Sequence, residues 1–298
     1  MTIKQISSYP IPAAEQWLAN KVDWPLEPSK AVLLIHDMQE YFVDFYGTDN
    51  PLINGVIEKI GKIKQACHSM GIPVVYTAQP QHQSTEDRAL LNDMWGPGLT
   101  KVEGKEKVVA ALTPSERDTV LTKWRYSAFH RSPLETTMKE QQRDQLLIVG
   151  IYGHIGVLQT AVDAFMLDIK PFLIGDAIAD FSLDDHIVAL NYIARNAGRT
   201  VATEEVLTRL VPQIQQSAKA TLNKDTLRQQ VIHYLDEDDL PENDDNLIDY
   251  GLDSVAVMTL IGEWKKAGVE LNFSELAKQP TIDAWWRLIA NSGSTANG

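Results

Sequence analysis

The sequence predicts an α/β domain, in which helices flank a parallel sheet, followed by a small all-α domain. Between about residues 31 and 202, short apolar runs alternate with longer amphipathic stretches, which is the pattern of βαβ units. After Leu210 this alternation ends, and a proline among polar residues precedes a purely helical pattern. The length of 298 residues fits two domains.

Six short apolar runs are predicted as the strands of a Rossmann-like parallel sheet. They are residues 32–35, 74–77, 119–122, 146–149, 172–174 and 200–202. Among the helices expected between them, the longest covers residues 53–70 and ends before Gly71. Another helix begins near Ser182, which together with Asp185 resembles a capping box.

Composition and charge exclude several classes of protein. Hydrophobic residues make up 44% and charged residues 22% of the chain, as in ordinary globular proteins. The net charge of −13, without a long cluster of Lys and Arg, argues against a nucleic-acid binder. Because no apolar stretch approaches the ~20 residues that cross a bilayer, no membrane association is expected. The polar N-terminus and the single cysteine, Cys67, predict a cytoplasmic protein.

The change of pattern after Leu210 predicts a domain boundary. We expect a first domain over residues 1–211, a polar linker over 212–217, a helical domain over 218–290 and a flexible tail over 291–298. In the helical domain, Leu227 and Val231 belong to the apolar face of a first helix.

A Gly-Leu-Asp-Ser tetrapeptide that ends at Ser254 opens a later helix. The apolar face of this helix is predicted at Val255, Met258, Ile261 and Trp264. A serine at a helix N-terminus lies where free backbone N–H groups and the helix dipole favour an attached phosphate, and Asp253 beside it would orient an incoming cofactor or metal. The alternative is that Ser254 only caps the helix, since serine is a favoured capping residue.

Three strands of the predicted sheet end in polar segments. HDMQ follows the first strand and contains Asp37, KWRYSAF follows the third and begins with Lys123, and GIYGHIG follows the fourth and ends with Gly156. Open α/β sheets bind ligands at the carboxyl ends of their strands. We therefore expect three adjacent strand ends to meet at one crevice.

These three segments resemble the isochorismatase-like hydrolase superfamily. Members that use a cysteine nucleophile combine an aspartate, a lysine and a cysteine, and Gly156 occupies the position of that cysteine here. Without a thiolate, the acyl-enzyme route of nicotinamidases and related amidases is closed. Cys67 does not replace it, because it lies on a predicted helix well before the motif, where we expect it to be a packing residue.

Glycine at this position matches the isochorismatases, which hydrolyse the enol ether of isochorismate to pyruvate and 2,3-dihydro-2,3-dihydroxybenzoate. That reaction needs an acid to protonate the enolpyruvyl group, and the resemblance implies Asp37 in this role, with Lys123 as the second catalytic residue and no metal. Burial and substrate carboxylates would raise the pKa of Asp37, whereas Lys123 would lower it. The sequence leaves both outcomes open.

The resemblance also carries substrate-contacting residues onto this chain by motif. They are Phe42, Gln79, Arg88, Trp95 and Tyr152. A dianionic substrate needs cationic groups such as Arg88 and Lys123, and the aromatic residues would separate a cyclohexadiene ring from bulk water. Taken without the resemblance, core packing of the aromatic residues and a solvated position for Arg88 explain them as well. We expect His36 and His154 to be structural hydrogen-bonding residues.

The resemblance covers nearly the whole chain and points to the bifunctional isochorismatase and aryl carrier proteins of catecholate siderophore synthesis, of the enterobactin and vibriobactin type. It implies a four-helix carrier domain with 4'-phosphopantetheine attached to Ser254, which holds 2,3-dihydroxybenzoate as a thioester. The implied partners are a phosphopantetheinyl transferase, the adenylation enzyme that activates 2,3-dihydroxybenzoate, and the condensation domain of a downstream nonribosomal peptide synthetase. A homo-oligomer through the hydrolase domain is also implied.

Three residues of the carrier domain, Met258, Phe273 and Ala277, match positions that face the downstream synthetase in related carriers. Judged by helical spacing alone, such apolar residues more often belong to the core of a small helical domain. Two other functions also stay open. Gly156 opposes a cysteine-type amidohydrolase with an accessory domain, and the presence of Asp37 and Lys123 opposes a non-catalytic carrier or scaffold protein.

Overall fold

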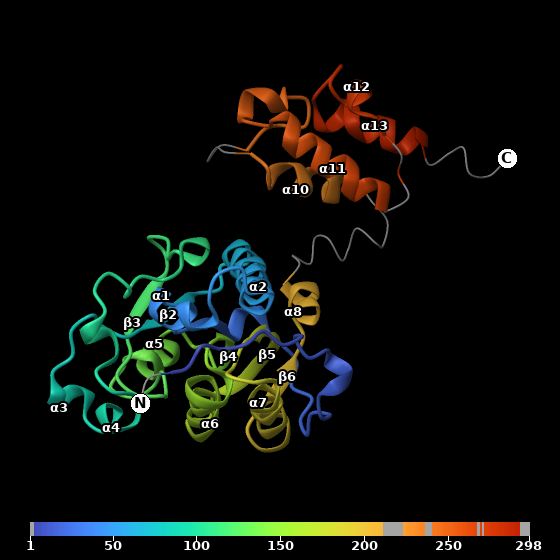
Figure 1. Ribbon diagram of the computed structural model, residues 1–298. Coiled ribbons are helices and arrows are strands. Elements are labelled where there is room, and N and C mark those ends of the chain that lie inside the picture. Colours follow the sequence, from blue (N-terminus) through green and yellow to red (C-terminus); the bar gives the residue numbers. More distant parts are fainter. Residues whose placement is uncertain (1–2, 211–222, 236–239, 267–268, 270, 293–298) are drawn as a thin grey trace. The chain divides into compact units, whose positions relative to one another are not determined.

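The computed structural model describes residues 3–210, 223–235, 240–266, 269 and 271–292. The chain divides into two compact units, residues 1–210 and 211–298. Figure 1 shows the first unit as a sheet between helices and the second as a cluster of helices. The linker predicted at 212–217 lies outside the described residues and stays a prediction. Residues 293–298 of the predicted tail lie outside them too, whereas residues 291 and 292 belong to a helix.

The sheet of the first unit has six parallel strands in the order β3-β2-β1-β4-β5-β6 (Figure 1). The strands are β1 (Ala31–His36), β2 (Val74–Ala78), β3 (Thr119–Thr122), β4 (Gln145–Gly150), β5 (Lys170–Ile178) and β6 (Arg199–Val201). All six predicted strands are present, and β5 is longer than predicted at both ends. β1 lies inside the sheet with every residue buried, which explains its unbroken apolar run.

The side chains of β1 alternate between the two faces of the sheet. Leu33 and Ile35 belong to the core that also contains residues of α2 (Pro51–Ser69) and α8 (Thr203–Leu210). Val32 and Leu34 belong to the core shared with α6 (Leu158–Met166) and α7 (Leu183–Asn196). Figure 1 shows these two pairs of helices on opposite sides of the sheet. The period of two along a strand therefore gives the domain its three layers.

Two of the predicted helices have clear local causes. Asn50 caps α2 by accepting a hydrogen bond from the Leu52 N–H at 3.0 Å. The Ser182 hydroxyl oxygen accepts from the Asp185 N–H at 3.1 Å and the hydroxyl donates to the Asp185 carboxylate at 2.7 Å. The cap is therefore present, but Asp185 contacts the hydroxyl of Ser182 rather than its backbone N–H. Cys67 is buried on α2, where burial raises the pKa of its thiol to about 12, so its packing role is confirmed.

Shorter elements complete the first unit. They are α1 (Glu40–Val43), α3 (Thr85–Arg88), α4 (Leu91–Trp95) and α5 (Leu134–Glu140), the 3₁₀ turns Ala14–Gln16, Pro28–Lys30, Asp44–Tyr46, Gly98–Lys101 and Ala110–Leu112, and the π-helical turn Gly153–Val157 that leads into α6. Among the residues that the structure describes, no helix is both long enough and apolar enough to cross a membrane.

The second unit has its own core. Its described elements are α10 (Lys224–Ile232), a 3₁₀ turn (Leu247–Tyr250), α11 (Ser254–Lys266), α12 (Phe273–Leu276) and α13 (Ile282–Ser292). Leu227 and Val231 are buried as predicted, next to Trp264 and Trp285. The indole N–H of Trp264 donates to the Gln230 side-chain oxygen at 2.8 Å, so this large ring is buried without an unpaired polar atom.

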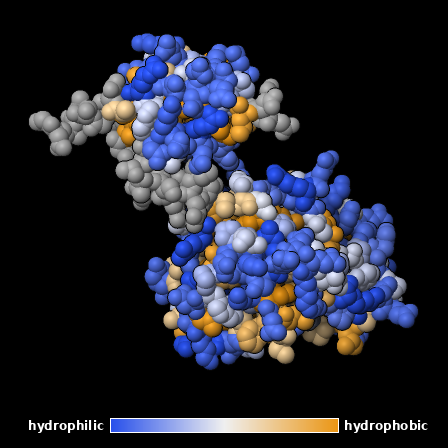
Figure 2. Space-filling model, turned by 180° about the vertical axis from the view of Figure 1, so that it is seen from behind, coloured by the Kyte–Doolittle hydropathy of each residue, from blue (hydrophilic) through white to orange (hydrophobic). Residues whose placement is uncertain are grey.

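The predicted apolar face of α11 is partly wrong. Ile261 and Trp264 pack in the core, but Val255 and Met258 are 70% and 57% exposed. Ala256, Val257 and Leu260 are the other buried residues of α11. Apolar residues occur on more than one face of this helix, so their spacing does not determine which face is buried. Figure 2 shows one face of each unit, where hydrophilic residues predominate and apolar residues form separate patches.

Candidate functional site

A pocket in the first unit lies at the carboxyl ends of the strands. Its lining includes all eight residues that were predicted for catalysis and substrate contact, namely Asp37, Phe42, Gln79, Arg88, Trp95, Lys123, Tyr152 and Gly156. Eight further residues that sequence reasoning missed complete the lining, namely Ile3, Tyr41, Leu91, Arg125, Tyr126, Ile151, Ile155 and Phe181. The structure brings the predicted residues together, and their individual roles stay predictions.

Four neighbouring strand ends, rather than three, border this pocket. Asp37 follows β1 and Lys123 follows β3, and the strand β2 lies between these two strands. Thr77 on β2 and Gln79 directly after it fill the interval. The expectation of three adjacent strand ends was wrong because the order of strands along a chain does not give their order in the sheet.

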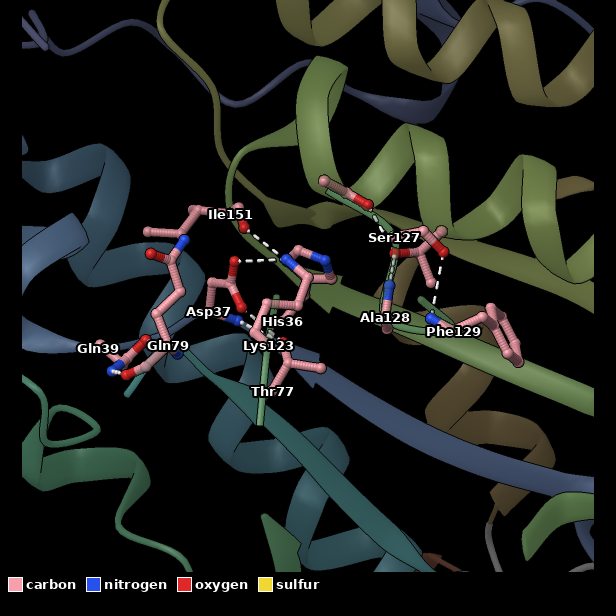
Figure 3. A network of polar contacts seen from close by, with 12 residues as sticks. His36, Asp37, Gln39, Thr77, Gln79, Lys123, Ser127, Ala128, Phe129 and Ile151 are labelled. Carbon is pink, nitrogen blue, oxygen red and sulfur yellow. Dashed lines mark hydrogen bonds and ion pairs between the residues drawn. The ribbon is translucent and has the colours of Figure 1, made fainter. Parts of the chain in front are cut away.

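Asp37 and Lys123 form a buried ion pair (Figure 3). Nζ of Lys123 donates a hydrogen bond to Oδ2 of Asp37 at 2.7 Å, and Oγ1 of Thr77 donates to Oδ1 of Asp37 at 2.6 Å. Asp37 is 7% exposed and Lys123 is 3% exposed. Asp37 has a φ of 49°, a region that non-glycine residues adopt rarely and that recurs at functional sites. The chain thus holds a carboxylate in place by one cation and one hydroxyl.

The charge state of Asp37, which the sequence left open, follows from these partners. Burial by itself raises the pKa of Asp37, but the charge of Lys123 and the hydrogen bonds from Lys123 and Thr77 bring this pKa below its ordinary value. Burial lowers the pKa of Lys123 more than Asp37 raises it. Asp37 is therefore ionised at neutral pH when the pocket holds no substrate.

Two histidines lie near the pocket in different environments. His36 is fully buried, and its Nδ1 donates to the Ile151 carbonyl oxygen at 2.8 Å (Figure 3). Burial and the charge of Lys123 lower the pKa of His36 to about 4, so its ring is neutral. His154 bonds through Nδ1 to Oδ1 of Asp180 at 2.6 Å, and that carboxylate holds the pKa of His154 above its ordinary value despite partial burial. Both contacts are those of structural hydrogen-bonding residues.

Two arginines in the pocket lack a carboxylate partner among the residues that the structure describes. Arg88 is 5% exposed, and its guanidinium donates to the Gly96 carbonyl oxygen at 2.6 Å and to Oε1 of Gln83 at 3.1 Å. Nη1 of Arg125 donates to the carbonyl oxygens of Asp87 and Trp124 at 2.8 and 2.7 Å. A buried cation without an anion is costly, which makes Arg88 a candidate to bind an anionic ligand. Arg125 is half-buried and lies close enough to Asp87 to lower the pKa of that carboxyl, and it is a candidate because its side chain lines the same pocket. Arg125 was not predicted as a pocket residue, although it is a basic residue only two positions after Lys123 in the sequence.

Gln79 is held in place by a buried glutamine. Nε2 of Gln39 donates to the Gln79 carbonyl oxygen at 2.9 Å, and the Gln79 N–H donates to Oε1 of Gln39 at 2.7 Å (Figure 3). These reciprocal bonds fix the backbone of Gln79 at the end of β2. Its side-chain oxygen lies 3.4 Å from Nη1 of Arg88, so the amide and the guanidinium border the same part of the pocket.

Aromatic side chains form an apolar wall. The rings of Phe42 and Tyr152 meet edge to face, with 6.1 Å between their centroids. The centroid of the Phe181 ring lies 4.6 Å from that of Tyr152 and 6.2 Å from that of Trp95. The Tyr152 hydroxyl donates to the Phe42 carbonyl oxygen at 2.7 Å, and the Trp95 indole donates to the Tyr126 hydroxyl at 2.9 Å. The polar atoms of these residues are thereby satisfied, and their rings are free to contact an apolar ring.

Potential metal ligands come together at one place in the described residues. One ligand atom each of His154, Asp180 and Asp185 lies within 4.8 Å of the others. The Asp180 carboxylate, however, already accepts hydrogen bonds from the His154 ring, from the His154 N–H and from the Phe181 N–H. These bonds explain why a fully buried carboxylate is tolerated there, and the arrangement is that of a structural cluster.

Ser254 is the first residue of α11 and is exposed. The helix is capped by its neighbour, because Oδ1 of Asp253 accepts a hydrogen bond from the Ala256 N–H at 2.7 Å. The alternative that Ser254 only caps the helix is therefore wrong, because Asp253 is the residue that caps α11. Within the described part of the chain, the Ser254 hydroxyl has no hydrogen-bond partner, so it is available at a helix N-terminus.

The three residues predicted to face a partner lie on the surface of the second unit. Met258 is 57% and Phe273 38% exposed, and Ala277 is exposed as well. None of the three belongs to the core cluster of the described residues. The core alternative fails for them, and their contact with a partner stays a prediction.

Comparisons with known proteins agree with this geometry. Residues 31–205 match the isochorismatase domain family, and residues 225–289 match the phosphopantetheine attachment site family. The chain is 53% identical to enterobactin synthase component B of Escherichia coli strain K12, over 97% of this chain and 99% of that protein. It is 46% identical to isochorismatase of Bacillus subtilis, over 97% of this chain and 96% of that protein.

Other relatives match a smaller part of this chain. A phenazine biosynthesis protein of Pseudomonas aeruginosa is 45% identical, over 69% of this chain and 98% of that protein. Among solved structures, a cysteine hydrolase of Pseudomonas syringae superposes with a TM-score of 0.58 at 23% identity, covering 63% of this chain and 96% of that one, which shows a shared fold. From the family match over residues 31–205 and the high identity to full-length relatives, we conclude that this chain belongs to the isochorismatase family and carries a C-terminal phosphopantetheine attachment domain.

Proposed function

We propose that the first unit hydrolyses isochorismate to 2,3-dihydro-2,3-dihydroxybenzoate and pyruvate, and that the second unit carries 2,3-dihydroxybenzoate as a thioester. The observation that supports the first activity is the charge of the pocket. Three cationic side chains, Arg88, Lys123 and Arg125, line it with a single carboxylate, Asp37. Isochorismate has two carboxylates, which this excess of positive charge would bind.

In the proposed reaction, Asp37 moves the proton. It is ionised in the free protein, so it must first acquire a proton. We propose that this occurs as the dianionic substrate enters, because a nearby anion raises the pKa of Asp37 while Lys123 turns to a substrate carboxylate. The proton comes from solvent, and substrate binding should therefore be accompanied by proton uptake.

Asp37 then gives its proton to the terminal methylene carbon of the enolpyruvyl group, which becomes a methyl group. The ether carbon is left as an oxocarbenium ion, and a water molecule adds to it and returns a proton to the Asp37 carboxylate. The resulting hemiketal then breaks its bond to the ring oxygen as its hydroxyl proton passes to that oxygen, which gives pyruvate and the ring alcohol. Gly156 has no side chain to attack, so water is the nucleophile, and the wall of Phe42, Tyr152 and Phe181 would keep other water away from the cation.

The second unit supports the carrier activity through Ser254, which is exposed and uncapped at the start of α11. A phosphopantetheinyl transferase would attach the phosphopantetheine arm to this hydroxyl. We propose that an adenylation enzyme then loads 2,3-dihydroxybenzoate onto the arm, and that a condensation domain of a nonribosomal peptide synthetase accepts it. The homo-oligomer through the hydrolase domain stays a prediction.

The test is to incubate the purified chain with isochorismate and to detect pyruvate with lactate dehydrogenase, with the Asp37→Asn variant as control. Pyruvate release by the wild type and its loss in the variant are expected. Turnover of nicotinamide in place of isochorismate would favour the amidohydrolase alternative. Turnover of neither, together with loading of Ser254, would favour a carrier without catalysis.

A further inference from the structure

The glycine at position 156 borders the ring of His36. A β-carbon added at Gly156 would overlap Cε1 of His36 and would lie 3.0 Å from both Nε2 of His36 and the Tyr126 carbonyl oxygen. The place of a side chain at 156 is therefore already filled by an imidazole from β1.

His36 cannot move aside without cost. It is the last residue of β1, its side chain is fully buried, and Nδ1 donates to the Ile151 carbonyl oxygen at 2.8 Å (Figure 3). Rotation of the ring would break this bond and leave a carbonyl oxygen unpaired in the interior. Nε2 lacks a well-formed hydrogen bond among the described residues, although the Tyr126 carbonyl oxygen lies close enough to raise the pKa of His36, so the half of the ring that faces Gly156 contributes mainly volume.

The backbone at Gly156 is held as firmly as the ring. Oγ1 of Thr160 donates to the Gly156 carbonyl oxygen at 2.7 Å and accepts from the Ala128 N–H at 2.9 Å. Ala128 is buried in the segment that follows Lys123 (Figure 3). Both sides of the contact are therefore fixed, and a side chain at 156 and an imidazole at 36 exclude one another.

We propose that His36 is a specificity-determining residue of this pocket. It occupies the space that a nucleophilic side chain at 156 would need, and so it restricts the pocket to reactions in which water, rather than the protein, attacks the substrate. The proposal takes this pocket as the active site of the proposed function, but it does not depend on the identity of the substrate.

The experiment combines substitutions at the two positions in the full chain. His36→Asn keeps an N–H donor near the place of Nδ1 and removes Cε1 and Nε2, whereas His36→Gln keeps atoms in the space near Gly156 and serves as the matched control. In the His36 background, Gly156→Ala should lower the Tm by roughly 2–12 °C through overpacking. In the His36→Asn background the same change should lower it by less than half as much, and in the His36→Gln background by nearly as much as with His36.

The proposal would be overturned if Gly156→Ala lowered the Tm equally in all three backgrounds. It would also be overturned if this substitution left the Tm unchanged in all of them. If Gly156→Ala or His36→Asn does not fold alone, position 36 is randomised in the Gly156→Ala background and folded clones are sequenced. Clones with side chains smaller than His are expected. The proposal would be contradicted if a folded clone retained His36 and melted at the wild-type Tm. The absence of any folded clone would also contradict the proposal.

A second readout tests the nucleophile directly. Gly156→Cys combined with His36→Asn should give a folded protein with one thiol that reacts with iodoacetamide beyond the wild-type background, which comes from the buried Cys67. Gly156→Cys with His36 retained should give little folded protein. If the single variant folds at the wild-type Tm and is alkylated at the same rate as the double variant, His36 does not control this space. None of these measurements uses isochorismate, so their failure is distinct from failure of the proposed function.

Discussion

Nζ of Lys123 lies 2.7 Å from Oδ2 of Asp37, and both side chains are almost fully buried at the base of the pocket. The pair closes the gap across β2 between the ends of β1 and β3. Each charge is tolerated in the interior because the other is present. Catalysis by Asp37 therefore requires that the substrate disturb this pair.

Asp37→Asn should abolish pyruvate release, since the amide cannot deliver a proton. Loss of a general acid typically costs about 10²–10⁴ in rate. The variant also leaves Lys123 without its anion, so we expect a lower Tm, which Asp37→Asn combined with Lys123→Met should partly restore without restoring activity. Pyruvate assays and thermal melts of the three proteins check this. Near-normal turnover in Asp37→Asn would remove Asp37 from the mechanism.

Arg125→Gln and Arg88→Gln should each raise the KM for isochorismate by roughly 10–150-fold, because each removes a charge-assisted hydrogen bond to a substrate carboxylate. Arg143→Gln is the matched control. Arg143 also donates to backbone carbonyl oxygens, those of Pro28 and Ala31, but it lies outside the pocket lining. Steady-state kinetics of the three variants separate the cases. An unchanged KM in Arg125→Gln would leave that residue a purely structural role.

Acid should destabilise the first unit partly through Asp118. Burial raises the pKa of Asp118, but hydrogen bonds from Ser115, His68 and Lys64 bring it down to about 2. A carboxyl with a lowered pKa stabilises the fold above its unfolded pKa, and this contribution disappears as the pH falls towards 2. Asp118→Asn should lower the free energy of unfolding at pH 7 by roughly 2 kcal/mol and flatten its decline between about pH 4 and pH 2.

Urea unfolding at several pH values measures this effect. Asp144→Asn provides the control, because its ion pair with Lys170 is exposed to solvent and should contribute little. An equal effect of the two substitutions would mean that the Asp118 cluster does not stabilise the fold.

Ser254→Ala should block attachment of phosphopantetheine completely and leave isochorismate hydrolysis unchanged. The hydroxyl is the acceptor, whereas the hydrolase residues lie in the other unit. Mass spectrometry after incubation with coenzyme A and a phosphopantetheinyl transferase detects the added group. Ser274→Ala removes another exposed serine and should have no effect. Modification of the Ser254→Ala protein would contradict the carrier assignment.

Phe273→Asp should slow transfer of the aryl group to the downstream synthetase without unfolding the second unit, because Phe273 is 38% exposed. Leu276→Asp, three residues later, is the contrasting change. Leu276 is fully buried, and a carboxylate there should unfold the unit. Circular dichroism and transfer assays distinguish the two. If Phe273→Asp unfolds as Leu276→Asp does, the residue belongs to the core.

Sequence patterns predicted what local chemistry determines. The fully buried β1 appears as an unbroken apolar run, and Asp37 and Lys123 directly follow strands, so the sheet and the centre of the pocket could be read from the chain. Phe181 and Ile3 also line the pocket, but they come from segments far from either motif. The sequence around Phe181 and Ile3 contains no pattern that predicts their position in the pocket lining.

Other features depend on competition between neighbours. Both Asp253 and Ser254 are able to cap α11, and only the structure shows that Asp253 does so. The same limit applies to Gly156, since the absence of a side chain is visible in the sequence whereas the His36 ring that fills the space is not.

The isolation of Cys67 has a practical consequence for the loaded protein. This thiol is the one cysteine of the chain, it is fully buried, and its pKa of about 12 keeps it protonated at neutral pH. Once the arm is attached, its terminal sulfur becomes the single thiol that a maleimide can reach. A fluorescent maleimide would then count free arms in a mixture of empty and acylated protein, with no engineered label and no cysteine to remove.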